Sequence, residues 1–178
     1  LFAGEDGVAA VSIIMYLQFL CIGIYFGFSM GLSTPLGYAY GDRNFSVCRV
    51  LEKYAYRFFA IAPIILYGCT YLLTPIGVRF FASPGSTVFD MAVSGMRLYG
   101  LGFLFSGINI FAAIRMMTYG KGYISGMITF LRSFALLLLF LTVLPRFLEL
   151  NGIWLAVPAA EILTLIVALW TLRKKTVV

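Results

Sequence analysis

The sequence predicts an all-α membrane protein, a polytopic bundle of five transmembrane helices. Of its 178 residues, 62% are hydrophobic and only 11% are charged. Soluble domains carry about 25% charged and about 45–50% apolar residues, so this composition lies well outside their range. Apolar stretches of roughly 20 residues recur along the chain, and that length is what a helix needs to cross the hydrocarbon core of a bilayer.

The first two predicted spans contain prolines. The first covers residues 7–40 and is long enough that it must be tilted, bent or extended past the membrane. Pro35 lies near its end, where we expect a bend and a candidate hinge, because proline removes a helical hydrogen bond. The second span covers residues 47–73, with Pro63 inside, and the letters TPIG are expected to end it.

The remaining three spans are bounded by turn, proline and basic signals. The third covers residues 88–118 and follows the turn sequence SPGS, which also offers capping residues. The fourth covers residues 123–144 and stops at Pro145. The fifth covers residues 152–172 and is closed by a basic cluster.

Lysine and arginine are distributed unevenly between the two ends of the predicted spans. Nine lie on one side of the membrane, and only Arg79 and Arg146 lie on the other. The positive-inside rule therefore predicts that the C-terminus is cytoplasmic, in a plasma membrane of the bacterial type. The nine predicted cytoplasmic cations are Arg43, Arg49, Lys53, Arg57, Arg115, Lys121, Arg173, Lys174 and Lys175.

The start of the chain lacks the basic region of a signal peptide, and the chain does not begin with methionine. Five spans with an outside N-terminus are unusual for such a chain. One more helix before Leu1 would return the true start to the cytoplasm. We therefore expect the sequence to be the end of a longer protein.

Several functional classes lack the residues they need. The chain contains no histidine, and its three cysteines, Cys21, Cys48 and Cys69, are widely spaced. A zinc site, a disulfide framework and a histidine-based catalytic triad are not predicted. We expect no enzyme activity, no cofactor and no metal site, and the basic residues at helix ends do not indicate nucleic-acid binding.

Three ionisable residues fall inside the apolar spans: Arg97, Arg132 and Glu161. Arg132 is about 18 Å, and Glu161 about 12 Å, along its own helix from the loop they share. An arginine side chain can bridge that mismatch, so one hypothesis is a buried Arg132–Glu161 ion pair that only holds helices together. The alternative is that Glu161 faces a cavity and binds a cation, a proton or a cationic drug.

Three motifs give the chain a resemblance to a known family. The first helix ends in GFSMGLSTPLGYAYGDRN, the third carries GINIFAAIRMMTYGKG, and the last begins NGIWLAVPAAEILTLIVAL. Together they resemble the second half of multidrug and toxic compound extrusion (MATE) transporters, particularly the branch of the staphylococcal multidrug pump type. The matching positions in the first and last motifs are Tyr40, Gly41, Asn44, Gly152, Ile153, Trp154, Ala156, Pro158 and Glu161.

This resemblance implies a fold of twelve helices in two lobes around a substrate cavity. The five spans would be helices eight to twelve, residues 1–178 would form most of the C-terminal lobe, and helix seven and the N-terminal lobe would be missing partners. The implied function is a proton- or sodium-coupled antiporter that exports drugs, organic cations or toxic metabolites by alternating access. The substrate would be cationic and amphipathic, and the fragment alone would not transport it.

The resemblance does not carry a coupling site into this chain. The coupling carboxylates of the family lie in helices that are missing here, or in helix ten, whose counterpart contains only Asp90, at its outer end. Two alternatives stay open. A lipid-linked sugar flippase of the same superfamily would use cations such as Arg97 and Arg132, and the chain could also be a truncated gene product that transports nothing.

Polar residues on the first and third spans are further binding candidates. Asn109 and Ser106 lie three residues apart on one helical face, and Gln18 and Tyr38 lie on the first span. These side chains could line a cavity or bond to neighbouring helices. The glycine motifs GFSMG, GLGFLFSG and GKGYISG predict close helix packing, and Trp154 and Trp170 are interpreted as belt residues at the membrane surfaces.

Overall fold

The computed structural model describes residues 4–173 and is helical throughout its regular structure, which confirms the predicted fold class. Five of its helical units are long and apolar enough to cross a membrane. Lys174 and Lys175, which contribute to the charge count, lie outside the described residues. The elements are α1 (Gly4–Gly41), α2 (Phe45–Val78), α3 (Thr87–Tyr99), η1 (Gly100–Gly102), α4 (Phe103–Thr118), α5 (Gly122–Phe130), η2 (Leu131–Ala135), α6 (Leu136–Val143) and α7 (Pro145–Arg173).

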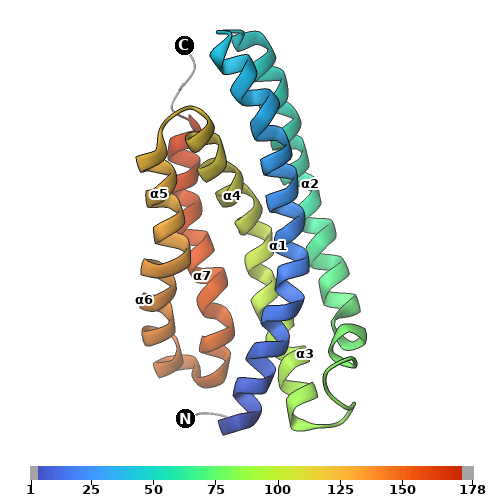
Figure 1. Cartoon of the computed structure of the whole chain (residues 1–178). Helices are drawn as coiled ribbons and strands as arrows, with labels where there is room; N and C mark the ends of the chain where they lie inside the picture. The colour runs from blue at the N-terminus through green and yellow to red at the C-terminus, as the bar shows by residue number, and fades with distance from the viewer. Residues whose placement is uncertain (1–3, 174–178) are drawn as a thin grey trace.

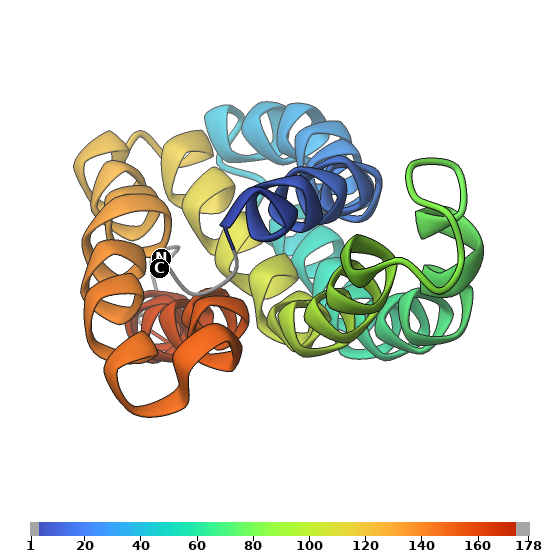
Figure 2. The same ribbon diagram turned by 90° about the horizontal axis from the view of Figure 1, so that it is seen from below.

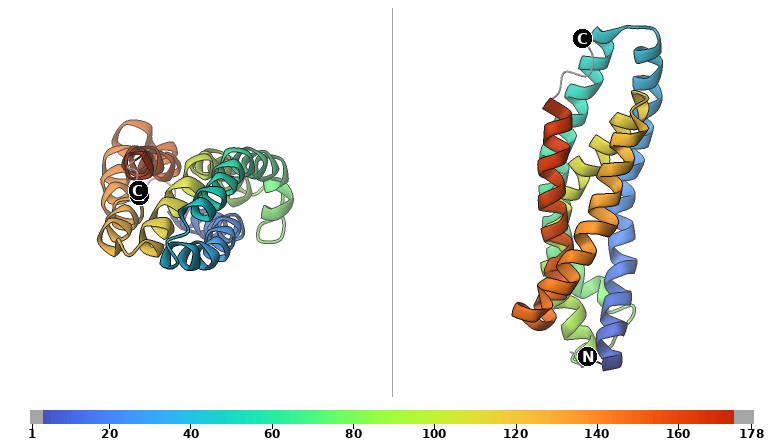
Figure 3. Two further views of the ribbon diagram at one scale, coloured as in Figure 1. Left: turned by 90° about the horizontal axis from the view of Figure 1, so that it is seen from above. Right: turned by 90° about the vertical axis from the view of Figure 1, so that its left-hand side faces the viewer.

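The five spans run side by side, and α4 lies in the middle of the bundle. In Figure 1, α1 and α2 form one flank, while α5, α6 and α7 form the other. Figure 2 and the left panel of Figure 3 view the same bundle along its axis, where α4 again separates the two flanks. The chain reverses direction at every loop, so the start of α1 and the end of α7 lie at opposite ends of the bundle, as an odd number of spans requires.

Four spans depart from regular α-helix or from the predicted bounds. The third span passes from α3 to α4 through the 3₁₀ turn η1, and the fourth passes from α5 to α6 through the π-helical segment η2. The fifth begins at Pro145 and is broken at Glu149, whose φ of 50° is not helical. Helix α2 continues to Val78, past the predicted end at residue 73, with Pro75 inside its last turn.

Only one of the three glycine motifs packs within the described lobe. Gly102 lies where a Cβ atom would be 3.5 Å from the backbone nitrogen of Pro158, and a Cβ on Gly107 would be 2.9 Å from the ring of Phe59. These glycines bring α4 close to α7 and α2. In contrast, a Cβ added to Gly27 or Gly126 would meet no atom of a neighbouring helix within 4 Å, so the other two motifs face open sides of the lobe.

The belt interpretation of Trp154 is wrong. Its side chain is only 2% exposed, and its ring lies 2.8 Å from the position that a Cβ on Gly95 would occupy. Trp154 therefore fills the contact between α7 and α3 and belongs to the main apolar core. Trp170, near the other end of α7, is 53% exposed.

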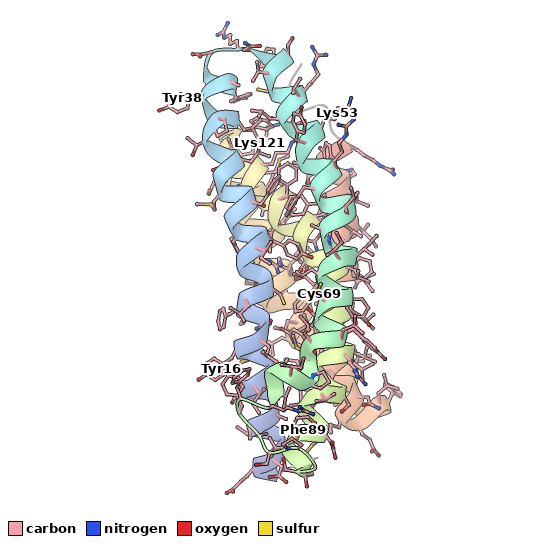
Figure 4. All side chains as sticks on the ribbon, turned by 90° about the vertical axis from the view of Figure 1, so that its right-hand side faces the viewer. Tyr16, Tyr38, Lys53, Cys69, Phe89 and Lys121 are labelled. Carbon is pink, nitrogen blue, oxygen red and sulfur yellow. The ribbon has the colours of Figure 1, made fainter. Side chains whose placement is uncertain are left out.

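The charge asymmetry has a clear counterpart in the fold. The loop between α1 and α2, the loop between α4 and α5 and the end of α7 meet at the upper end of Figure 1, and Figure 4 places Lys53 and Lys121 there. Arg79 follows α2 and Arg146 begins α7, both at the opposite end. The segments predicted to be cytoplasmic thus share one end of the bundle. That this end faces the cytoplasm stays a prediction.

Candidate functional site

A buried polar centre joins three helical segments around Glu161 of α7. Arg132 donates from Nη2 and Nε to Glu161 Oε1, over 2.6 and 3.1 Å. Asn109 of α4 donates from Nδ2 to Glu161 Oε2 over 2.7 Å and to the Glu161 backbone oxygen over 2.9 Å. Because the Glu161 side chain is only 5% exposed, this carboxylate depends on partners from its own lobe.

Arg132 reaches Glu161 from the irregular segment η2. This segment is π-helical between two α-helices, and such insertions often occur at functional sites because they change the direction of the following side chains. Asn109 comes from α4, where it is completely buried. The predicted Arg132–Glu161 ion pair is therefore present, and Asn109, predicted only as a cavity or packing residue, completes it.

Three buried polar atoms near the middle of the lobe lack a hydrogen-bond partner among residues 4–173. They are the hydroxyl oxygens of Ser29 and Ser106 and the side-chain oxygen of Asn109. Ser106 lies one turn before Asn109 on α4 and is 2% exposed. Unpaired buried groups of this kind are costly unless water, a ligand or another part of the protein reaches them. The binding role predicted for Ser106 and Asn109 stays a prediction.

The candidate residues on α1 lie apart from one another. Gln18 accepts a hydrogen bond from the Tyr99 hydroxyl of α3, so this amide is bonded to protein. Tyr38 is 75% exposed and lies near the upper end of α1, where it points away from α2 (Figure 4). It borders an open depression of about 490 Å³ that also contains Asp42 and Thr118. Pro35 lies within α1, one turn before Tyr38, and its hinge role stays a prediction.

The structure also contains a second buried ion pair, which the sequence did not predict. Arg115 of α4 donates from Nε to Glu52 Oε1 of α2, and the Tyr119 hydroxyl donates to the same oxygen over 2.6 Å. The Arg115 side chain is 4% exposed and its guanidinium lies 5.0 Å from the centre of the Tyr119 ring. Burial and the hydrogen bond to Glu52 raise the pKa of Tyr119 above its ordinary value, so its hydroxyl stays protonated and donating.

The signal for this pair was the spacing of Arg115 and Tyr119. Residues four apart share a helical face, so both side chains point toward the same helix, here α2. Arg115 lies in the last turn of its span, where a solvated cation is the ordinary expectation. The third ionisable residue inside the spans, Arg97, stacks its guanidinium over the Tyr71 ring at 4.5 Å, and its Nε has no partner in the described part of the chain.

A model of the MatE family matches residues 1–144. The chain belongs to this family. The match covers α1 to α6, including Arg132, Asn109 and the second ion pair, so it confirms the resemblance noted in the motifs. Among curated protein sequences, none matches the chain significantly.

Solved structures of MATE transporters share the fold of this family member. The Vibrio cholerae MATE transporter VcmN, solved as a mutant, matches 96% of the chain with a TM-score of 0.87 and 20% identity. A MATE protein in complex with MaL6 matches 96% with a TM-score of 0.86 and 20% identity. A superfamily transporter from Pyrococcus furiosus, described as having a binding pocket of reversed polarity, matches 94% with a TM-score of 0.83 and 21% identity.

The MatE chain spans about two fifths of each of these transporters, namely 39% of the first two and 38% of the third. At this level of identity the matches establish the fold and not the substrate. The chain is thus a membrane-spanning protein of a transporter family, and the rest of such a transporter lies outside it. The helical bundle described here corresponds to part of a larger assembly of spans.

Proposed function

We propose that this chain is part of a cation-coupled secondary antiporter that exports organic cations, drugs or toxic metabolites by alternating access. The observation that supports this most is the family match over residues 1–144, together with a fold shared over 96% of the chain with a MATE transporter. In transporters of this kind a lobe moves largely as a rigid body around a central site. Two buried ion pairs join α4 to α2 and η2 to α7, and the hydrogen bond from Asn109 to Glu161 connects α4 to α7, as a rigid lobe requires.

The partners in this proposal are helix seven and the N-terminal lobe, which would form the substrate cavity together with this chain. The coupling ion would be a proton or sodium, the substrate a cationic amphipath, and the membrane a bacterial-type plasma membrane with the basic end of the bundle in the cytoplasm. Residues 1–178 produced alone should therefore not transport, although they contain most of one lobe.

Efflux of a fluorescent organic cation from cells or inverted vesicles tests the proposal in the full-length transporter. Export should collapse when an uncoupler removes the proton gradient, or when sodium is replaced by potassium. Export that ignores both gradients would contradict an antiporter. Transfer of a lipid-linked anionic sugar between leaflets would instead support the flippase, which Arg97 favours because part of its guanidinium lacks a partner among residues 4–173.

Within this function we assign Glu161 a positioning role rather than a coupling role. Both of its carboxylate oxygens already accept hydrogen bonds from the same lobe, one from Arg132 and the other from Asn109. In the full-length transporter, Glu161→Gln should lower stability while efflux stays dependent on the ion gradient. A Glu161→Gln protein that is normally expressed and folded, yet binds the cation without gradient-driven export, would show that Glu161 couples transport.

A further inference from the structure

A groove of about 400 Å³ runs between α1 and α2 on the half of the bundle nearest the α2–α3 loop. Its walls come from the turns of α1 that contain Leu17 to Ile24 and the turns of α2 that contain Leu66 to Gly77, with Met96 and Phe80 completing it. Figure 4 looks onto this face and shows Cys69, one of the wall residues, in the half of α2 nearer the α2–α3 loop. The groove is separate from the polar centre around Glu161.

The lining of the groove is apolar and suits a hydrocarbon ligand. Both of its hydroxyl groups already have partners in the protein, because Thr74 Oγ1 donates to the Thr70 backbone oxygen over 2.5 Å and Thr70 Oγ1 lies 3.5 Å from Cys21 Sγ. The other walls are largely apolar, and the lining contains no aspartate, glutamate, lysine, arginine or histidine. A charged or strongly polar ligand would lose its hydration here without finding a partner.

The length of the groove matches one leaflet of a bilayer. From Leu66 to Gly77 the helix rises about 16 Å at 1.5 Å per residue. The hydrocarbon of one leaflet is about 15 Å thick, half of the bilayer core. The outer flanks of the groove are apolar and open, since Leu20 and Leu72 are each 73% exposed. Among residues 4–173 these surfaces are uncovered, which gives a lipid chain access from the side of the lobe.

A cation and an aromatic pair mark the polar end of the groove. Arg79 follows the last turn of α2, next to the wall residue Phe80, is exposed, and makes no salt bridge among residues 4–173. Tyr16 of α1 stacks on Phe81 at 5.8 Å between ring centres, at the same end (Figure 4). Exposed aromatic rings of this kind sit at the level of lipid headgroups, where a cation attracts an anionic phosphate.

We propose that this groove binds one acyl chain of an anionic phospholipid whose headgroup phosphate contacts Arg79. The lipid fills the space between α1 and α2, where the two helices leave their apolar sides unpaired. It acts as a structural lipid of the lobe and does not compete with the transported substrate.

Native mass spectrometry of the purified full-length protein with added phosphatidylglycerol or phosphatidylcholine tests the acyl-chain part. We expect one retained phosphatidylglycerol per chain. Cys69→Trp places a large ring in the groove and should reduce retention about tenfold, because buried hydrocarbon is worth about 0.8 kcal/mol per methylene. Ile64→Trp is the matched control, since Ile64 is exposed on α2 but does not line the groove. Equal retention by the two variants would overturn the proposal.

Arg79→Gln tests the headgroup. It should lower the preference for phosphatidylglycerol over phosphatidylcholine about fivefold, since one cation near anionic lipid contributes about 1 kcal/mol. Arg146→Gln is the control, because Arg146 is exposed at the same end of the bundle but lies at the start of α7. An unchanged preference in Arg79→Gln, or an equal change in both variants, would overturn the assignment of Arg79.

Photolabelling of the unsubstituted protein avoids any effect of a variant on folding. In vesicles of phosphatidylcholine and phosphatidylglycerol, a lipid with a photoreactive group in its acyl chain should label residues 17–24 and 66–80 in preference to α5 and α6. An excess of tetraphenylphosphonium should not displace it. Displacement by this amphipathic cation would make the groove a drug site, and crosslinks between two copies of the chain would make it a dimer contact; either result overturns the proposal.

Discussion

The lobe contains two buried carboxylate–arginine pairs that are built alike but lie at different depths. In the central pair, Glu161 accepts from Arg132 and Asn109; in the end pair, Glu52 accepts from Arg115 and Tyr119. In each case the carboxylate accepts hydrogen bonds from an arginine and from a neutral donor, and the contacts connect α4 to another span. The central carboxylate is 5% exposed and lies well inside α7, whereas Glu52 is 13% exposed and lies near the basic end of the bundle.

The difference shows how depth changes the cost of the same chemistry. A charge in the middle of a span has no water nearby, so all of its partners must come from the protein. A charge close to the span end can regain water when a partner is lost. We therefore expect the central pair to be the more fragile of the two, and four substitutions test this comparison in order of decreasing effect.

Arg132→Met should have the largest effect. It leaves the Glu161 carboxylate buried with only Asn109 as a partner, and breaking a buried pair in this way costs about 3–5 kcal/mol of unfolding free energy. Denaturant titration of the purified protein in detergent micelles measures the loss. The double variant Arg132→Met, Glu161→Leu should recover most of it, because no unpaired charge remains. A double variant no more stable than the single one would show that packing, not charge, is responsible.

Arg115→Met breaks the end pair and should cost less, about 1–3 kcal/mol. Tyr119 still donates to Glu52, and the carboxylate is close enough to the span end to regain water. The same titration, run beside Arg132→Met, gives the comparison directly. A loss as large as that of Arg132→Met would mean that water reaches Glu52, near the start of α2, no better than it reaches Glu161 in the middle of α7.

Asn109→Leu removes the neutral donor of the central pair. The lost hydrogen bonds to Glu161 should cost stability, but the substitution also removes the Asn109 oxygen that has no partner among residues 4–173. The two effects oppose each other, so the net cost should be about 1 kcal/mol. Thermal unfolding followed by circular dichroism suffices as a readout. A cost above that of Arg115→Met would place Asn109 among the main supports of Glu161.

Tyr119→Phe removes the neutral donor of the end pair and should have the smallest effect, about 0.5–1.5 kcal/mol at neutral pH. Its pH dependence is more specific. Because the folded protein raises the pKa of Tyr119, the stability that this hydroxyl contributes is complete below its unfolded pKa of about 10 and is lost as the pH rises beyond it. The stability difference between the two proteins should therefore shrink above about pH 10. A constant difference would contradict the hydrogen bond to Glu52.

The central pair could be predicted from the sequence, whereas the end pair could not. Glu161 and Arg132 stand alone in long apolar runs, and each needs a partner at the same depth, so their pairing follows from helix length. Arg115 and Glu52 lie close to basic loops, where a solvated charge is the ordinary case. The two side chains meet because of how α4 and α2 are rotated about their axes, and the sequence does not indicate that rotation.

The glycine motifs and Trp154 show the same limit of prediction from sequence: it does not indicate which helical faces meet. GLGFLFSG packs against α7 and α2, while Gly27 and Gly126 face open sides, although all three motifs have similar spacing. Trp154 lies near a span end, as belt residues do, yet it is buried against Gly95. Small-residue spacing predicts that a helix can approach a neighbour closely. It does not indicate which face of the helix meets that neighbour.

The sequence alone thus determined the fold class, the five spans and the family, and it offered the central ion pair as one of two hypotheses, because hydropathy, helix length and the cost of a buried charge are properties of each segment. The tertiary structure decided which helical faces meet, and so the end pair, the burial of Trp154 and the groove beside α2. Rotation about a helix axis leaves hydropathy unchanged but moves every side chain to a new neighbour. In a lipid environment this rotation is set by packing and hydrogen bonds between helices.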